Sequence, residues 1–440
     1  MQQFENIIIG AGFAGFGAAY ALSNGKKNYV ILESRDTFGG LCSNFEIDGF
    51  RFDRFVHLSF SNNEAVNEIF RQGSPKVLRH TPNPSNIYKG KWIKHPAQNN
   101  LYVLEDWEKK AIIEDFLHRP AIEESMKPAN YEEWLRWQYG NYFAEHFPMV
   151  YTMKYWMREA KELRTEWVGN RLYQPSVQEV ISGSKSEDKV QRYYAKEMRY
   201  PEIGGYSSFV SSLAKKSDIH YNTEVKVIDT KSKTLKDQNG NEYKYTRLIS
   251  SIPLPDIINA LTDVPEVVKD AAAKLACTHG YHISIALRTK RIPPYLWWYI
   301  YDEDCLAARV HSPSMKSLDN APEGCSSLQM EVYCDEKEYT EDELKARTVG
   351  YLIGLGIIHE EDILFVHIGY EKYANVIFTE PIYESRKTVR DYLSSVGIET
   401  IGRFGEWDYL WSDQSLMSGF NINKTHEKTI NNIDFYEKFV

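Results

Sequence analysis

Residues 10–20 read GAGFAGFGAAY, and the glycines of this stretch decide the fold. Gly10, Gly12 and Gly15 match the pattern GxGxxG, in which glycines permit a tight turn, close approach of the backbone to a pyrophosphate, and close helix packing. The apolar residues 7–9 predict a buried strand before the loop, and the alanine-rich run after it predicts a helix. The stretch therefore predicts the first crossover of a doubly wound nucleotide-binding unit.

Glu33 ends a second predicted strand, NYVILES, about twenty residues after the loop. A carboxylate at this place can accept hydrogen bonds from both hydroxyls of a ribose. NAD and FAD share this fingerprint, so the loop alone leaves both cofactors open.

Composition narrows the function classes. The 440 residues are 42% hydrophobic, enough for two or three structural units, and carry 52 Lys and Arg against 61 Asp and Glu. Without a basic tract, no nucleic-acid partner is expected. Five cysteines without CxxC spacing predict neither disulfides nor a metal site, and they favour a reducing, cytoplasmic location. No apolar run reaches the length of a transmembrane segment.

The remainder of the chain alternates between helix and strand patterns. Residues 103–198 are charged with aromatic residues at helix-face spacing, which predicts a helical insertion, while Asn239-Gly240 between alternating runs predicts a hairpin. The predicted fold is α/β, with a doubly wound FAD-binding Rossmann-type domain, a helical insertion and a mixed β-sheet substrate domain. The expected domain ranges are 1–85, 199–255 and 385–440 for the cofactor domain, 100–198 for the helical domain, and 86–99 with 256–384 for the mixed sheet.

The residues after Glu33 favour FAD over NAD. The run ESRDTFGGLC resembles the extended signature of two-dinucleotide-binding flavoproteins. That resemblance implies that Arg35, Gly39, Gly40 and Leu41 extend the pyrophosphate site towards a flavin.

Scattered motifs from residue 10 to about 420 resemble the UDP-galactopyranose mutase family, which shares its opening with amine oxidases, desaturases and protoporphyrinogen oxidase. FDRFVHLSF resembles the flavin loop of the mutases, and WIKHPAQNN resembles a strand at their substrate site. YWMREAKELRTEWVGNRLYQP and YIYDEDCLAAR resemble the segments that carry the two phosphate-binding arginines. The residues implied for the catalytic and substrate sites are His57, Gln98, Asn99, Trp156, Arg171, Tyr299 and Arg309.

The motif GRFGEWDYLWSDQSLMSG is the strongest of these resemblances. It implies that Tyr409 meets the substrate phosphates and that Arg403 lies beside the flavin pyrophosphate. The further cofactor contacts that the resemblance implies are Val225, Gly402, Asp413, Gln414 and Ser415.

The chain departs from the family pattern at several places. Phe55 and Val56 stand where the mutase loop has glycines, which predicts a stiffer loop before His57. Ala97 and Ala308 replace an aromatic residue and a tyrosine, and Phe378 lacks the hydroxyl of a phosphate-contacting tyrosine.

The resemblance implies a mutase that interconverts the pyranose and furanose forms of a nucleotide-diphosphate sugar, in the biosynthesis of cell-surface polysaccharide. The family mechanism uses reduced FAD (FADH−), whose N5 forms an adduct with the sugar without net redox. Arg171, Arg309 and Tyr409 would stabilise the departing diphosphate, and His57 would support the flavin loop. An external reductant such as NAD(P)H would keep the flavin reduced. The alternatives are an oxidase, dehydrogenase or desaturase of the amine oxidase type, and a non-catalytic nucleotide-binding protein.

Overall fold

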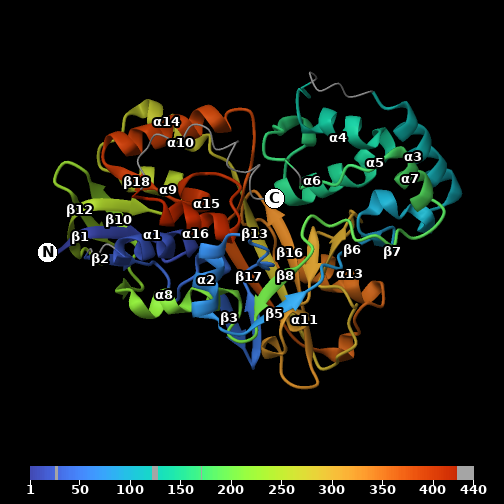
Figure 1. Cartoon of the computed structure of the whole chain (residues 1–440), viewed down its shortest axis with the longest axis horizontal. Helices are drawn as coiled ribbons and strands as arrows, with labels where there is room; N and C mark the ends of the chain where they lie inside the picture. The colour runs from blue at the N-terminus through green and yellow to red at the C-terminus, as the bar shows by residue number, and fades with distance from the viewer. Residues whose placement is uncertain (25–27, 121–126, 170, 424–440) are drawn as a thin grey trace.

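The computed structural model describes residues 1–24, 28–120, 127–169 and 171–423, which form two large sheets and the helices around them (Figure 1). Residues 424–440, expected to close the cofactor domain, lie outside the described part of the chain.

The first sheet contains the glycine loop and has the strand order β10-β11-β12-β1-β2-β9, with β18 also pairing with β12. The central pairs β12-β1, β1-β2 and β2-β9 are parallel, while β10-β11 and β11-β12 are antiparallel. The Asn239-Gly240 turn joins β11 to β12, as predicted, and Gly240 has a φ of +79°. The strands are β1 (Gln2–Ile9), β2 (Tyr29–Leu32), β9 (Ile219–His220), β10 (Val225–Asp229), β11 (Thr234–Asp237), β12 (Glu242–Ser250) and β18 (Ile398–Thr400).

Helices cover both faces of this sheet, because successive residues of a strand point to opposite faces. Ile8 packs in one core with Phe16 of α1, and Ile7 packs in another with Ile257 of α9. The fold is therefore the expected α/β arrangement, with a Rossmann-type unit. The helices around this sheet are α1 (Phe13–Asn24), α2 (Glu64–Gly73), α8 (Ser211–Lys216), α9 (Leu254–Ala260), α10 (Glu266–Ala273), α14 (Ile382–Ser395), α15 (Gly402–Gly405) and α16 (Ser412–Phe420).

Two of these helices come from opposite ends of the chain, and Figure 1 shows α1 beside α16. A Cβ on Gly419 would lie 1.9 Å from the Ala14 carbonyl oxygen, and one on Gly17 would lie 2.0 Å from the Leu416 carbonyl oxygen. Only glycine at these positions permits the observed contact between the two backbones.

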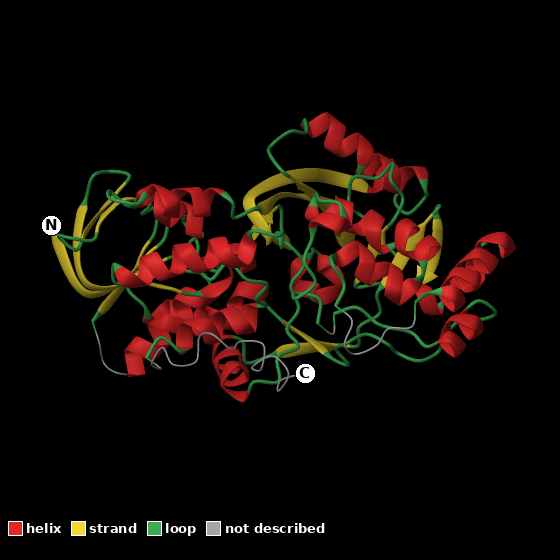
Figure 2. Cartoon of the chain, turned by 90° about the horizontal axis from the view of Figure 1, so that it is seen from above, coloured by secondary structure: helices red, strands yellow, loops and turns green. Residues whose placement is uncertain are grey.

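The second sheet has the order β17-β13-β16-β15-β14-β6-β7 and is antiparallel except for the β14-β6 pair. Seen from above in Figure 2, its long curved strands are separate from the strands of the first sheet near the N-terminus. Its strands are β6 (Ser85–Tyr88), β7 (Lys91–Lys94), β13 (Cys277–Leu287), β14 (Trp297–Ile300), β15 (Arg309–His311), β16 (Ser326–Cys334) and β17 (Ile363–Val376), and its helices are α11 (Pro313–Lys316), α12 (Glu341–Arg347) and α13 (Val349–Gly354).

A helical segment covers one end of the second sheet, where the sequence predicts a helical insertion. On α6, Lys154 Nζ donates to the carbonyl oxygens of Ile300 (3.1 Å) and Ala307 (3.4 Å), which ties the segment to the β14-β15 connection. The helices are α3 (Asp106–His118), α4 (Tyr131–Tyr139), α5 (Asn141–His146), α6 (Pro148–Trp156) and α7 (Val177–Gly183). Two short ribbons, β3 (Asn44–Ile47) with β4 (Phe50–Asp53) and β5 (Val77–His80) with β8 (Met198–Pro201), complete the fold.

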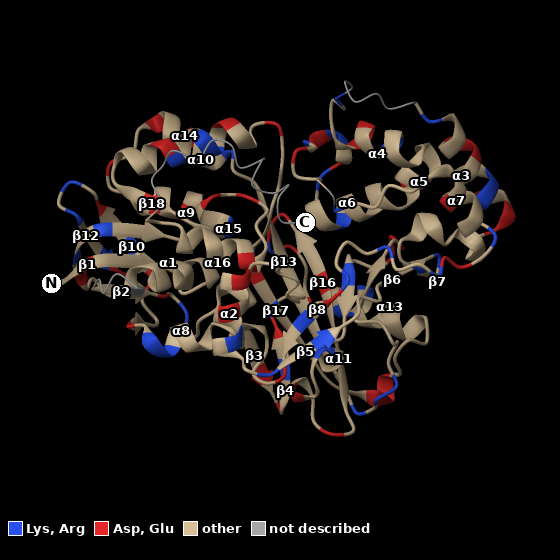
Figure 3. Ribbon diagram, in the orientation of Figure 1, with Lys and Arg blue, Asp and Glu red and all other residues tan. Residues whose placement is uncertain are grey.

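Charged residues of both signs are interspersed along the ribbon (Figure 3). Among the described helices, none is both long enough and apolar enough to span a bilayer.

Candidate functional site

One cavity of about 610 Å³ lies between the first sheet, the second sheet and the helical segment. Gly10, Gly12 and Glu33 line one end of it, and Trp156 and Arg171 line another part. The glycine-loop end lies beyond the carboxyl ends of β1 and β2, the place where open α/β sheets bind their ligands.

The glycine loop has the geometry that the sequence predicts. Gly10 has a φ of +98°, and a Cβ on Gly15 would lie 2.0 Å from the Gly10 carbonyl oxygen. A Cβ on Gly12 would meet nothing within 4 Å, so the backbone there faces open space. The loop thus leaves room for a phosphate group to approach its backbone.

Glu33 is held at the edge of this loop. Its carboxylate accepts hydrogen bonds from the backbone nitrogens of Ala11 (2.7 Å) and Arg35 (2.9 Å). Gly39 has a φ of +107° and donates its N–H to the Ala11 carbonyl oxygen. The pair Gly39-Gly40 therefore packs on the glycine loop. Carboxylate, glycine loop and adjacent arginine together fit the ribose and pyrophosphate of a dinucleotide.

Most of the residues expected from the sequence line this cavity. They are Gly10, Gly12, Glu33, Arg35, Gly39, Gly40, Leu41, His57, Trp156, Arg171, Tyr299, Arg309, Gly402, Arg403, Tyr409, Asp413 and Ser415.

Five expected residues lie elsewhere. Gly15 packs against the turn of its own loop, and Val225 begins the edge strand β10. Gln414 Oε1 accepts from the Trp411 N–H at 2.9 Å, which caps α16 instead of facing the cavity. Gln98 and Asn99, expected at the substrate site, do not line the cavity either.

Gln98 and Asn99 belong to the short 3-10 helix Ala97–Asn99, and neither lines the cavity. Gln98 donates to the Tyr173 carbonyl oxygen at 2.9 Å, and Asn99 is fully buried. The backbone of Asn99 packs on α7, where a Cβ on Gly183 would lie 2.2 Å from its carbonyl oxygen. The Gln98 side chain and the Asn99 backbone therefore contact the helical segment.

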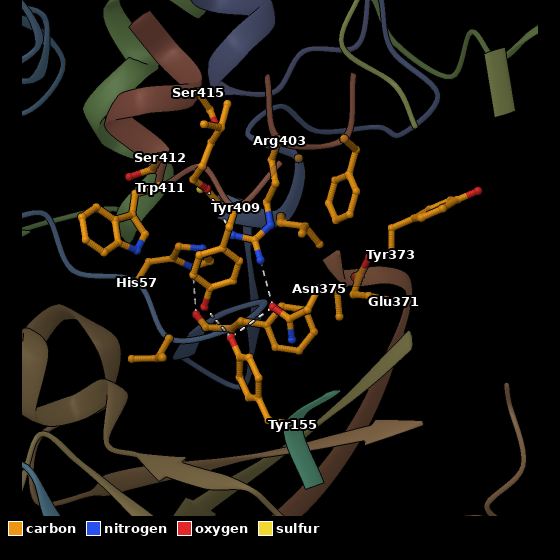
Figure 4. Close-up of a pocket in the computed structure, with 18 of the residues that line it drawn as sticks. His57, Tyr155, Glu371, Tyr373, Asn375, Arg403, Tyr409, Trp411, Ser412 and Ser415 are labelled. Carbon is orange, nitrogen blue, oxygen red and sulfur yellow. Dashed lines mark hydrogen bonds between the residues drawn. The ribbon is translucent and has the colours of Figure 1, made fainter. Parts of the chain in front are cut away.

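A hydrogen-bonded group at the centre of the cavity connects Arg403 with two tyrosines (Figure 4). Asn375 Oδ1, on β17, accepts from Arg403 Nη2 (2.9 Å) and from the Tyr155 hydroxyl (3.1 Å). The hydroxyls of Tyr155 and Tyr409 are 3.0 Å apart. Because Tyr155 donates to Asn375, its oxygen is the acceptor for the Tyr409 hydroxyl. Burial raises the pKa of Tyr155 well above its usual value, so the hydroxyl stays protonated.

Two guanidinium groups approach the ring of Tyr409. The Cζ atoms of Arg171 and Arg403 lie 4.9 Å and 4.5 Å from its centroid, and Arg171 also approaches the ring of Trp411, at 5.1 Å. Two cations beside one aromatic ring make this part of the cavity suitable for an anion.

Arg309 lies in the same cavity but is paired with Glu331, a residue that the sequence analysis missed. Glu331 is fully buried and accepts from Arg309, from the Tyr333 hydroxyl (2.8 Å) and from the Val56 N–H (2.9 Å). Burial alone lowers the pKa of Arg309, but the Glu331 charge outweighs it and the pKa is raised well above its usual value. Glu331 thus connects the loop before His57 to an arginine at the anion end.

His57 is neutral at pH 7, since burial lowers its pKa to about 4. Its Nδ1 lies 3.0 Å from the Phe55 carbonyl oxygen and therefore carries the proton, which leaves Nε2 as an acceptor. Phe55, one of the departures from the mutase pattern, stacks on Tyr333 with a centroid distance of 6.1 Å. Phe55 therefore packs this loop against β16 of the second sheet.

Three buried polar residues of this site have no motif that identifies them: Glu331, Glu371 and Asn375. Glu331 lies on β16, whose residues are all buried, and Glu371 and Asn375 are buried positions of β17, so burial, which no motif reveals, distinguishes them. Within the described residues, no cluster of three or more His, Cys, Asp or Glu is arranged to hold a metal ion.

One family model matches the segment that contains the glycine loop. The model for NAD(P)-binding Rossmann-like domains matches residues 8–72. All-trans-retinol 13,14-reductase of Danio rerio is 26% identical over 111 residues, which cover 25% of this chain and 18% of that enzyme. The human enzyme is 34% identical over 56 residues, which cover 13% of this chain and 9% of that enzyme. The chain thus matches less than a fifth of the length of these curated relatives.

Solved structures cover nearly the whole chain. The crystal structure of reduced UDP-galactopyranose mutase superposes with a TM-score of 0.89 at 24% identity, covering 95% of this chain and 94% of that one. This chain has the fold of UDP-galactopyranose mutase.

The same fold extends to oxidases. A protoporphyrinogen oxidase structure from Exiguobacterium sp. 255-15 has a TM-score of 0.72 at 15% identity, covering 96% of this chain and 97% of that one. Putrescine oxidase bound to putrescine has a TM-score of 0.65 at 15% identity, covering 95% and 98%. The same architecture is thus common to a mutase and to oxidases.

Proposed function

We propose that this chain binds FAD and, with the flavin reduced, interconverts the pyranose and furanose forms of a nucleotide-diphosphate sugar. The observation that carries the proposal is the continuity of one cavity, from the glycine loop and Glu33 to the arginines and tyrosines around Tyr409. An enzyme that acts on a neutral amine or an apolar substrate has no need for the part of the cavity that the arginines around Tyr409 line.

The cofactor end would hold FAD by its ribose and pyrophosphate. Glu33 would accept from the adenosine ribose, while the Gly12 backbone and Arg35 would face the pyrophosphate. When bound and reduced, the flavin supplies a nucleophile for the anomeric carbon of the sugar, without net electron transfer. The chain provides binding, orientation and electrostatics around that chemistry.

The anion end would hold the diphosphate and stabilise it as it leaves the sugar. Arg171 and Arg309 present planar groups that can donate paired hydrogen bonds to phosphate oxygens. Among the described residues, none accepts from Arg309 Nη1, so this donor is left for a ligand. The Tyr409 hydroxyl, now bonded to Tyr155, can turn its proton to a phosphate oxygen.

Aromatic walls would exclude water from the sugar. Tyr155, Trp156 and Tyr299 line this part of the cavity, and Tyr299 lies 5.4 Å from the His95 ring. Burial lowers the pKa of His95 to about 4, so this imidazole adds no positive charge at pH 7. Like His57, it offers a neutral polar surface.

The alternative is an FAD-dependent oxidase or dehydrogenase, favoured by the architecture shared with protoporphyrinogen oxidase and putrescine oxidase. On the mutase proposal, an external donor such as NAD(P)H reduces the flavin. All five cysteines are free, which fits a reducing compartment, and we place the protein in the cytoplasm.

The test uses the purified protein and its bound cofactor. The cofactor is released and identified, and the holoenzyme is then reduced with dithionite without oxygen and incubated with UDP-galactopyranose and a panel of other nucleotide-diphosphate sugars. We expect FAD, and a furanose product, seen by NMR, that forms only with reduced enzyme and without stoichiometric loss of reductant. Turnover by oxidised enzyme with consumption of oxygen, and no change of ring size, would establish the oxidase alternative instead.

A further inference from the structure

Glu371 joins two arginines from different parts of the chain at the cofactor end of the cavity. It lies on β17 of the second sheet, and its side chain is 3% exposed. Its Oε2 accepts from Arg35 Nη2 and its Oε1 from Arg54 Nη1, both at 2.5 Å. Arg35 follows β2 and Arg54 follows β4, so one carboxylate connects the second sheet to two loops of the dinucleotide-binding unit.

Glu371, Arg35 and Arg54 form a triad in which not every hydrogen-bond donor has an acceptor within the described residues. Arg54 Nε donates to Ser43 Oγ at 2.8 Å, which fixes the second arginine from another side. Arg35 Nη1 is buried, and no residue in the described ranges accepts from it. Arg35 and Glu371 line the cavity together with Gly39 and Gly40. A buried guanidinium donor beside a glycine pair requires an acceptor, and a bound ligand can supply it.

We propose that Glu371 is a positioning residue for the cofactor, which holds Arg35 so that its free donor meets a pyrophosphate oxygen of FAD. The inference rests on the FAD assignment of the proposed function. A guanidinium on a flexible side chain loses rotamer freedom when it binds a phosphate, and a carboxylate that fixes it beforehand removes part of that cost. Arg54 holds the second oxygen of Glu371 and so fixes the carboxylate itself.

On this proposal, the positioning of Arg35 by Glu371 favours FAD binding, whereas the negative charge of Glu371 opposes it. The triad carries one net positive charge, from two guanidinium groups and one carboxylate, and the negative charge of Glu371 by itself repels an anionic pyrophosphate. Glu371→Gln removes that charge and, on charge alone, tightens FAD binding. The same change breaks the bridge, because the amide oxygen can accept from one arginine while the amide nitrogen faces the other donor. Weaker FAD binding in this variant is therefore the signature of positioning.

The experiment compares wild-type and Glu371→Gln holoenzymes. Flavin fluorescence after dilution gives the rate of FAD release, and ultrafiltration gives its dissociation constant. We expect the variant to bind FAD at least about tenfold more weakly, the effect of losing one charge-assisted hydrogen bond. Glu380→Gln, which removes an exposed carboxylate that is paired with Arg164, is the charge-matched control and should bind FAD as the wild type does.

A second variant keeps the net charge constant. Arg54→Lys retains one positive charge but lacks the two separate nitrogens from which Arg54 bonds Glu371 and Ser43, and Arg54 does not itself line the cavity. We expect faster FAD release in this variant as well. Unchanged or tighter FAD binding in Glu371→Gln, or unchanged release in Arg54→Lys if the first variant does not fold, would overturn the positioning role. A folded wild-type protein without FAD would overturn the cofactor assignment and this inference together.

Discussion

Arg309 and Glu331 occupy directly opposed positions on β15 and β16, and Arg309 donates to a single oxygen of Glu331 from Nε (2.9 Å) and Nη2 (2.6 Å). The pair lies in the interior, with the arginine side chain 18% exposed and the glutamate side chain fully buried. The arginine is thus oriented before any ligand arrives.

Breaking this pair should cost stability. Glu331→Leu leaves the Arg309 charge unpaired in the interior, and we expect the free energy of unfolding to fall by about 3 kcal/mol or more. The double variant Arg309→Leu/Glu331→Leu removes both charges and should recover part of that loss. Urea unfolding at pH 7 measures both values, and strictly additive losses would show that the two residues do not interact.

Arg171 should contribute to the binding of nucleotide diphosphates without affecting the flavin. We expect Arg171→Ala to weaken UDP binding about tenfold or more, because it removes charge-assisted hydrogen bonds to the diphosphate. Arg171→Lys should restore only part of the affinity, since it lacks the planar fork. Calorimetry gives the affinity and the visible spectrum reports the flavin. Arg158→Ala, which removes an arginine paired with Asp335, is the control, and equal affinity in all variants would assign Arg171 a structural role.

His282 should make the fold sensitive to acid. Its ring is 1% exposed, with neither nitrogen bonded within the described chain, and burial first, then Arg54, His367 and Arg35, lower its pKa to about 3. The unfolded state therefore binds the proton more readily, so stability is complete above about pH 6.5 and falls as the pH drops towards 3.

The matching variant is His282→Leu, which removes the titrating group at similar volume. Between pH 7 and pH 5, the wild type should lose about 2 kcal/mol more of its unfolding free energy than the variant. His57 and His95 act in the same direction in both proteins, because their pKa values are also lowered. Urea titrations at the two pH values test this, and equal losses would contradict it.

Gly419 should not tolerate a side chain. A Cβ there meets the backbone of α1, with Ala14 O at 1.9 Å and Ala18 N at 2.6 Å, so Gly419→Ala must separate α1 from α16. We expect a loss of about 3 kcal/mol in unfolding free energy and a lower FAD content. Gly354→Ala on α13 has no atom within 4 Å of the new Cβ and should be neutral or slightly stabilising. Equal stability of the two variants in thermal unfolding would contradict the packing argument.

The sequence predicts those features that local patterns determine. The glycine loop, Glu33 and the Asn239-Gly240 hairpin depend on a few adjacent residues with special backbone requirements, and each is present. The motif residues around Tyr409 reach the cavity because a short helix and its flanking loop carry them there together.

Tertiary relationships explain what the sequence analysis missed. Glu331 is central because strand register places it opposite Arg309, whereas Glu371 and Asn375 are central because tertiary packing brings distant arginines and a tyrosine to them. Gln98 shows the converse, since the motif is present but the 3-10 turn that carries it lets its side chain donate to the Tyr173 carbonyl oxygen of the helical segment. Neither the register nor the direction of that turn is contained in the local pattern.

The nucleotide-binding unit can complete its folding only when α16 packs against α1 and β18 pairs with β12. A ribosome adds about 5 to 20 residues per second, so roughly 20 to 80 seconds separate the emergence of the glycine loop from that of α16. During this interval the glycine-rich face of α1 has no partner to cover it. On the proposed function, the flavin would be loaded only once α16 has packed against α1.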